Sequence, residues 1–276
     1  MKRKIFYFIF IILILLSTGY FFALIFKKQF PASSDYPHGE KWQLASPTAD
    51  TQLPDVIIES SENQNTSPKK NEKEKLLDIS QKIVQTVPFI VQAPFGNWND
   101  RDFQNACEEA SMIMAMGYVK GEKGISPEEA QKRILALIDF ENKTLGYSTD
   151  TNDEDMEKIF REYFRHENAQ AQDNITITDI KSEIQKGRVV IIPAFGQALN
   201  NPYFTQPGPV AHMLLIIGYD PKTREFITND PGTRKGASYR YKESALFEAI
   251  WEYPSGASDP PYPEGEKTKA FISVGK

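Results

Sequence analysis

The sequence predicts an α+β domain in which helices come first and mostly antiparallel strands follow. Between residues 103 and 187, apolar residues recur every three or four positions within several segments, which is the period of a helix buried on one side. From residue 189 onward they form short continuous runs of strand length, at 189–193, 210–219 and 225–228. Helices followed by strands along the chain are typical of α+β folds.

The N-terminus carries a long uncharged segment. The 22 residues Ile5 to Phe26 lie between Lys2-Arg3-Lys4 and Lys27-Lys28, and a helix of that length spans the ~30 Å hydrocarbon core of a bilayer. We therefore expect residues 1–28 to be a signal anchor that leaves the rest of the chain outside the cytoplasm. The alternative is a secreted protein, released by signal cleavage near Ser17-Thr18-Gly19.

Residues 29–80 are expected to be a disordered linker. They are rich in polar and charged residues, and the run Ser60 to Lys75 contains no aliphatic side chain. Such a segment buries too little apolar surface to offset its chain entropy. Val56-Ile57-Ile58 is the one apolar cluster in it. The globular domain is therefore assigned to residues 81–276.

Charge and cysteine content narrow the function further. Beyond the anchor the chain has 27 Lys and Arg against 37 Asp and Glu, a net charge of −10. An acidic domain lacks the electrostatic footprint of a nucleic-acid-binding protein. The single cysteine excludes an internal disulfide, and in an exported protein such an unpaired thiol is a candidate reactive group.

The elements of the domain follow from caps and periodicity. Residues 84–91 are expected to form an entering strand with Pro88 at its edge. Helices are expected to begin near residues 106, 127, 153 and 178, the second of them at a Ser-Pro-Glu-Glu start. A strand near residues 239–241, a helix over 242–251 and a last strand over 270–274 complete the domain.

Cys107 is expected in the first turn of a helix. Ala106, Ala110, Ile113 and Met114 are spaced as on one buried helical stripe. The helix dipole and free amide N–H groups at such a position stabilise a thiolate and can lower its pKa from ~8.5 to ~3.5–7.5. The alternative is a cysteine that packs in the core as a small apolar residue.

A histidine and an aspartate are expected to meet at one edge of the sheet. His212 lies near the start of the run 210–219, and Asp230 follows the run 225–228. A turn at Asp220-Pro221-Lys222-Thr223 makes these runs neighbouring antiparallel strands. A base and the acid that orients it would then lie together, as a Cys-His-Asp relay requires.

Four phrases of the sequence occur in the order typical of one family. They are VPFIVQAP at 87–94, QNACEEAS at 104–111, HMLLIIGYD at 212–220 and FITNDPGT at 226–233. In these phrases the chain resembles the C39-like cysteine peptidases, bacterial relatives of papain. The resemblance runs from about residue 85 to the C-terminus. It implies a papain-like fold, with the catalytic helix packed against a mostly antiparallel sheet.

The resemblance also implies roles for individual residues. Cys107 would be the nucleophile, His212 the general base and then acid, and Asp230 the group that orients the imidazole. A glutamine before the cysteine would help to bind the oxyanion, and the VPxxxQ phrase makes it Gln92. An insertion separates Gln92 from the cysteine and leaves Gln104 much closer, so Gln104 is the alternative.

The resulting prediction is a membrane-anchored extracytoplasmic cysteine peptidase or amidase that needs no cofactor and acts on a peptide or protein. Acyl transfer through the same thioester, an inactive papain-like binding module and a zinc site at Cys107, His212 and Asp230 are the alternatives. In the resembling family the loop before His212 lies beside the cleft, which implies that Asn201, Pro202 and Tyr203 shape the substrate site. A proline-driven turn is the alternative there.

Overall fold

The computed structural model describes residues 79–256 and 268–276, which lie in the second of two compact units, Lys69–Lys276. The expected anchor, the linker up to residue 78 and its cluster Val56-Ile57-Ile58 lie outside the described residues. In the part of the chain that the structure describes, no helix is both long enough and apolar enough to span a bilayer.

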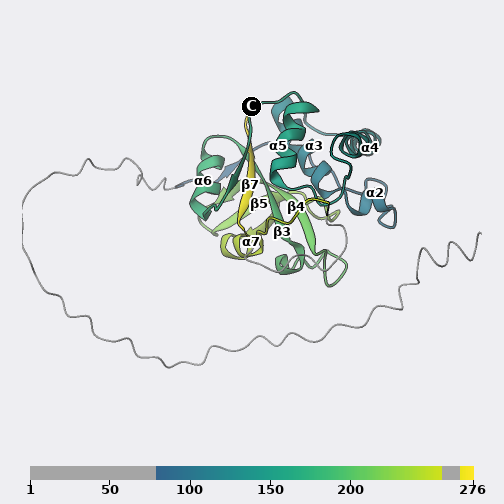
Figure 1. Cartoon of the computed structure of the whole chain (residues 1–276). Coiled ribbons are helices and arrows are strands. Elements are labelled where there is room, and N and C mark those ends of the chain that lie inside the picture. The colour runs from purple at the N-terminus through teal and green to yellow at the C-terminus, as the bar shows by residue number, and fades with distance from the viewer. Residues whose placement is uncertain (1–78, 257–267) are drawn as a thin grey trace, which may run out of the picture. The chain divides into compact units, whose positions relative to one another are not determined.

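An antiparallel sheet forms the centre of the domain (Figure 1). In the described residues it has seven strands, and six of them form one path. In spatial order these are β2 (Ala169–Asp173), β7 (Ala270–Val274), β3 (Val189–Phe195), β4 (Ala211–Asp220), β5 (Glu225–Asn229) and β6 (Tyr239–Lys242). The short strand β1 (Ile83–Val84) pairs with β4 outside that path. The mostly antiparallel sheet of the sequence prediction is therefore confirmed.

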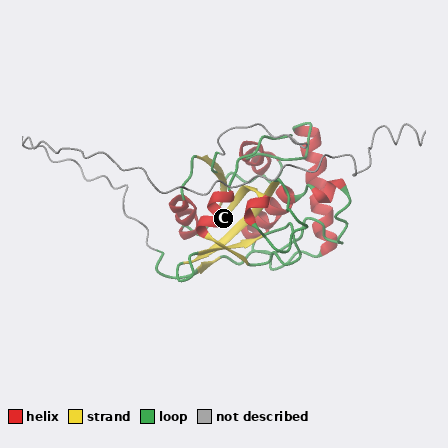
Figure 2. Ribbon diagram, turned by 90° about the horizontal axis from the view of Figure 1, so that it is seen from below, coloured by secondary structure: helices red, strands yellow, loops and turns green. Residues whose placement is uncertain are grey.

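Helices cover both faces of this sheet (Figure 2). They are α2 (Arg101–Gln104), α3 (Cys107–Lys120), α4 (Pro127–Thr144), α5 (Asp153–Glu162), α6 (Ile177–Gln185), the 3₁₀ turn η2 (Gly196–Leu199) and α7 (Glu243–Ala249). The first apolar core contains α3, α4 and α5, and the second contains α6 and α7. The sheet thus separates two cores.

Strand β4 shows how the sheet serves both cores. Met213 and Leu215 belong to the first core, whereas Leu214 and Ile216 belong to the second. Side chains alternate between the faces of a strand, so a strand buried on both faces reads as a continuous apolar run. This is the reason why residues 210–219 carry almost no polar side chain.

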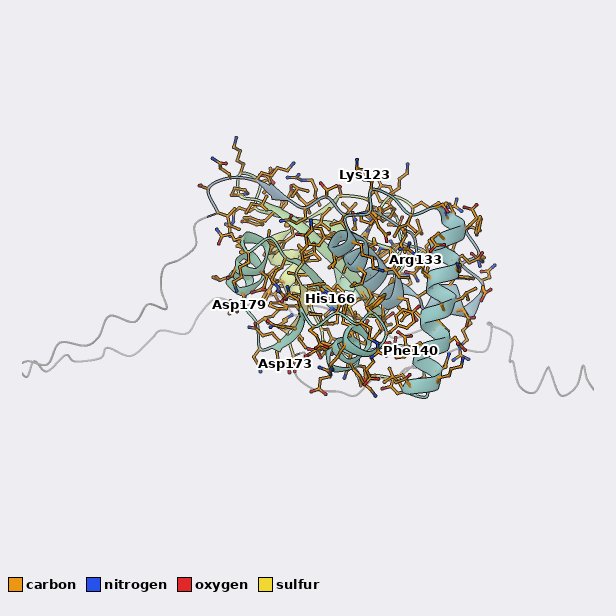
Figure 3. The ribbon with its side chains drawn as sticks, turned by 90° about the horizontal axis from the view of Figure 1, so that it is seen from above. Lys123, Arg133, Phe140, His166, Asp173 and Asp179 are labelled. Atoms are coloured by element: carbon orange, nitrogen blue, oxygen red, sulfur yellow. The ribbon has the colours of Figure 1, made fainter. Side chains whose placement is uncertain are left out.

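The helix starts follow from local sequence. Ser126 caps α4 by accepting a hydrogen bond from the Glu129 N–H, and Asn152 caps α5 in the same way. Along α4, Arg133 binds Glu122 and Glu129, and Phe140 contacts the ring of Tyr163 at the end of α5 (Figure 3). These contacts fix the outer helix against its neighbour.

The prediction of a strand over residues 84–91 is wrong. Only Ile83–Val84 forms a strand with β4, and after one more hydrogen bond, from the Gln85 N–H to the Ile217 oxygen at 2.8 Å, the chain leaves the ladder. Pro88 has no N–H to give to a strand partner. Its ring instead packs against α3, where Gly117 leaves room: a Cβ there would lie 2.4 Å from the proline Cγ. The segment is thereby held over the helix that begins with Cys107.

Candidate active site

Cys107 is the first residue of α3, as the sequence predicted. The N-cap residue Ala106 offers no side-chain hydrogen bond, so no N-cap side chain occupies the backbone N–H groups of the first turn. The helix packs against β4, and the cysteine side chain is buried at that contact. The nucleophile candidate therefore sits between a helix start and the central sheet.

His212 and Asp230 lie together at one edge of the sheet. His212 is the second residue of β4, and Asp230 follows the last residue of β5. The two strands pair in antiparallel register through the turn that the sequence predicted. The imidazole Nε2 lies 2.9 Å from Asp230 Oδ1, and both side chains are buried.

Asp230 accepts three further hydrogen bonds. The Gly232 N–H donates to Oδ1 at 3.0 Å, whereas the Tyr241 hydroxyl and the Asn201 amide donate to Oδ2 at 2.7 and 3.3 Å. Burial opposes ionisation, but the charge of His212 and these donors outweigh it and lower the pKa of Asp230. The carboxylate is therefore held ionised beside the imidazole.

A cavity of about 720 Å³ brings the candidate residues to one surface. Cys107, His212, Gln92 and Gln104 all line it. Its remaining lining comes from the loops at 96–98, 203–209 and 232–234, together with Ala211. Its volume is within the range of sites that bind small molecules or short peptide segments.

The thiol of Cys107 donates to Glu108 across a distance of 3.0 Å between Sγ and Oε2. Burial, the Glu108 charge and this hydrogen bond raise the thiol pKa well above its usual value, although the Met213 N–H opposes them. The expectation of a lowered thiol pKa is thus wrong for this structure. The helix dipole favours the thiolate and lowers the thiol pKa. Burial removes the water that would solvate the thiolate, and at Cys107 this raises the pKa by more than the dipole lowers it.

Two more buried glutamates lie behind the nucleophile. Glu108 also accepts from Tyr253 at 2.6 Å, and burial raises its pKa against these two donors. Glu109 and Glu141 face each other, and apart from the Glu109 backbone N–H no other donor to their oxygens is found among the described residues. Burial and the neighbouring carboxyls raise the pKa of both. The contact between the two carboxyl groups is explained if they share one proton.

The two glutamines differ in what their amides contact. The Gln92 Nε2 donates to the carbonyl oxygens of Phe103 and Gln104, at 3.1 and 2.8 Å. Gln92 is buried and therefore ties the end of α2 to the preceding segment. The side chain of Gln104 is exposed at the cavity. To donate to an oxyanion, the Gln92 amide would have to give up one of these two hydrogen bonds to carbonyl oxygens.

Sequence reasoning missed Glu108, Tyr253 and Tyr241. A glutamate next to the cysteine inside the buried run at 107–118 is the only signal that points to Glu108. The other two lie far along the chain and show no local pattern. Of the loop residues expected at the site, Tyr203 lines the cavity, whereas Asn201 is buried against Asp230.

Within residues 79–256 and 268–276, no group of three or more His, Cys, Asp and Glu side chains is placed to hold a metal ion. The zinc alternative at Cys107, His212 and Asp230 therefore gains no support. The neighbours of these three residues are instead the proton donors and acceptors described above.

The class of protein now follows from comparison. The model of the Peptidase_C39 like family matches residues 84–259. The chain belongs to this family, and the resemblance drawn from the four phrases is confirmed. A crystal structure from Bacillus anthracis, described only as a candidate C39-like peptidase, is 17% identical and has a TM-score of 0.44. The comparison covers 71% of this chain and 98% of that chain. No curated protein matches the chain.

Proposed function

We propose that the chain is a cysteine peptidase or amidase that hydrolyses a peptide or amide bond through Cys107, His212 and Asp230. The observation that carries the proposal is the cavity in which Cys107 and His212 line one surface while Asp230 holds the far nitrogen of the imidazole at 2.9 Å. Membership of a peptidase family supports the same chemistry. No cofactor is required.

The geometry assigns the two imidazole nitrogens different tasks. Nε2 faces Asp230, so Nδ1 remains to accept the thiol proton. In the resting structure the thiol donates to Glu108, so the sulfur must turn from Glu108 toward the imidazole before proton transfer. Asp230 then stabilises the imidazolium by its charge.

The reaction proceeds through a thioester. The Cys107 sulfur adds to the carbonyl carbon after its proton passes to His212, and the resulting oxyanion is bound by backbone and side-chain N–H groups. The C–N bond breaks, and His212 returns the proton to the leaving amine. Water then adds to the thioester, with His212 accepting a proton from it, and release of the acid restores the thiol.

The proposal places the peptidase domain outside the cytoplasm, held by an N-terminal anchor. The uncharged stretch Ile5 to Phe26 and its basic flanks support this location. Protease digestion of intact cells tests it. Loss of the domain without lysis is expected, and full protection until lysis would contradict it.

Labelling and peptide digestion test the proposed catalytic role. The full chain and its Cys107→Ala and His212→Ala variants are incubated with a complex peptide mixture, and new termini are counted by mass spectrometry. Only the wild type is expected to produce them at a substantial rate, because each variant removes a group that acts in bond breaking. Cys107 is the only cysteine, so iodoacetamide reports its accessibility directly.

The digestion has two informative alternatives. Adding a primary amine separates hydrolysis from acyl transfer, because a transferase yields mainly the amide of the added amine. Equal numbers of new termini from the wild type and the Cys107→Ala variant would contradict the proposal. The binding-module alternative is favoured by one observation, the thiol that is hydrogen-bonded to a carboxylate instead of to the imidazole.

The oxyanion donor is tested by a matched pair of variants. We expect Gln92→Ala to lower kcat by about 10²- to 10³-fold, since one lost oxyanion donor has that effect, and Gln104→Ala to lower it by less than about threefold. Because Gln92 also ties α2 to its neighbours, thermal unfolding of both variants is measured. The reverse order of the two effects would assign the donor to Gln104.

A further inference from the structure

Among the described residues, a single permanent charge lines the candidate active-site cavity. It belongs to Arg234, in the loop that follows Asp230. The other side chains described at the cavity wall are neutral or, in Cys107 and His212, titratable. No carboxylate is among them. The cleft therefore differs from the domain as a whole, in which acidic residues outnumber basic ones.

Arg234 has no acidic partner among the described residues. The ion pairs of this part of the chain use five other arginines: Arg133, Arg161, Arg188, Arg224 and Arg240. Arg234 takes part in no ion pair and no side-chain hydrogen bond described for residues 79–256 and 268–276. Its five N–H groups are therefore available to a ligand.

The exposed guanidinium of Arg234 lies against backbone and not in a salt bridge. It lies directly against Gly96, where an added Cβ would come within 2.1 Å of Nη2. Gly96 also adopts a φ of +76°, which side-chain-bearing residues rarely take. A glycine at this position thus leaves space for the arginine at the mouth of the cavity.

The loop of Arg234 runs past the imidazole. Two residues before Arg234, a Cβ added at Gly232 would lie 2.7 Å from His212 Cε1. His212 is the group that returns a proton to the leaving amine. The part of a substrate that contacts the loop 232–234 is therefore the part that departs with this amine, on the C-terminal side of the broken bond.

We propose that Arg234 recognises a carboxylate on the leaving-group side of the substrate. This inference rests on the proposed hydrolytic function and names its substrate class: peptides with an acidic side chain shortly after the scissile bond, or with a free C-terminal carboxylate there. A guanidinium binds a carboxylate through two parallel hydrogen bonds, which fix orientation as well as charge. A lysine at this position would supply the positive charge but not the two parallel hydrogen bonds.

Binding to the full chain with the Cys107→Ala change tests the inference without any need for turnover. The probes are four fluorescent hexapeptides of alanine and glycine that carry Asp or Asn at the fourth position and a free or amidated C-terminus. We expect a carboxylate to tighten binding about tenfold. A benefit confined to Asp or confined to the free terminus identifies the source of the carboxylate.

Changes at Arg234 should remove this preference selectively. In the Cys107→Ala background, Arg234→Gln should reduce the benefit of a carboxylate to less than about twofold, and Arg234→Glu should reverse it. Lys235→Gln is the matched control, because Lys235 is the adjacent exposed cation and does not line the cavity. Retention of the full preference in Arg234→Gln, or no preference in the parent chain, would overturn the inference.

Digestion by chains that keep Cys107 then separates the two hypotheses. If the wild type cleaves peptides without any Asp, Glu or free terminus after the cut, the proposed function stands and this inference fails. If carboxylate binding depends on Arg234 but no peptide is cleaved, carboxylate recognition by Arg234 stands and the proposed hydrolysis fails. Arg234→Lys is expected to restore part of the rate, chiefly through a lower KM than in Arg234→Gln.

Discussion

Asp230 and the pair of Glu109 and Glu141 are all shielded from water, yet the pKa of the aspartate is lowered and that of each glutamate is raised. Asp230 faces four donors, from His212, Tyr241, Asn201 and the Gly232 backbone. The two glutamates face each other, and their surroundings supply one backbone N–H and further carboxyls instead of side-chain donors. Both sites are buried, so the number of hydrogen-bond donors at each site decides whether the pKa of its carboxyl group is lowered or raised.

Glu108 lies between these extremes. It has two donors, the thiol of Cys107 and the hydroxyl of Tyr253, and burial still raises its pKa. Cys107 thus lies between His212 and Asp230, where a charge is stabilised, and Glu108, where burial disfavours a negative charge. Turning the sulfur from Glu108 to His212 transfers it from one site to the other.

Removing the carboxylate of Asp230 should have the largest effect. In Asp230→Ala, His212 loses the group that holds Nε2, and kcat/KM is expected to fall by about 10⁴-fold. Tyr241 would lose its acceptor, while Asn201 would keep only its bond to the Tyr241 hydroxyl, so the free energy of unfolding should fall by about 3 kcal/mol. Peptide cleavage and urea denaturation measure the two losses.

The variant Asp230→Asn sharpens this comparison. Its carbonyl oxygen can still accept from His212, but its NH₂ group would meet the Asn201 amide, which is also a donor. A loss of activity close to that of Asp230→Ala is expected, because an amide in this position can favour the wrong imidazole tautomer. Wild-type activity in Asp230→Ala would contradict the orienting role of this residue.

Replacing Glu108 should make the thiol more acidic. In Glu108→Gln the negative charge beside Cys107 is gone, while the amide oxygen can still accept from Tyr253. We expect the midpoint of iodoacetamide labelling to move to lower pH by about one unit. Glu109→Gln is the matched control, since its charge acts on the thiol more weakly than that of Glu108. An unchanged midpoint in Glu108→Gln would show that burial alone raises the thiol pKa.

What the sequence could predict was local. His212 and Asp230 are joined by a hairpin, so alternation and a turn sufficed to place them together. The start of α3 at Cys107 and the boundaries of β7 also followed from short patterns. In each case the determining residues lie within about one element of the feature that they determine.

What the sequence could not predict depends on distant partners. One of the two donors to Glu108 is Tyr253, 145 positions away, and no nearby residue indicates it. Strand β2, Ala-Gln-Ala-Gln-Asp, lacks the apolar signal of a strand and exists because β7 pairs with it about a hundred residues later. The prediction of a lowered pKa for the Cys107 thiol was wrong for the same reason, because burial of this residue depends on the assembled fold.

The smallest effect tests the pair of Glu109 and Glu141 through the pH dependence of stability. Burial first, then like charge, raises the Glu141 pKa to about 8, compared with ~4.3 in an unfolded chain. The folded state then binds more protons than the unfolded state between these values, so stability falls as the pH rises through this window. In Glu141→Gln, the amide of the new side chain can donate to Glu109 without taking up a proton. This substitution should reduce the slope by about 1 kcal/mol per pH unit between pH 5 and 8.

Urea denaturation at several pH values gives this slope. Glu252, with a pKa raised to about 9 by burial and by Asp153, contributes a slope of the same sign in both proteins, so the difference between them reports on the pair of Glu109 and Glu141. Asp139→Asn is the matched control on the same helix, because Asp139 is exposed and its ion pair with Lys143 contributes little. Identical slopes in the wild type and Glu141→Gln would mean that the two carboxyls do not share a proton. The contrast with Asp230 would then need a cause other than a shared proton, because burial is common to both sites.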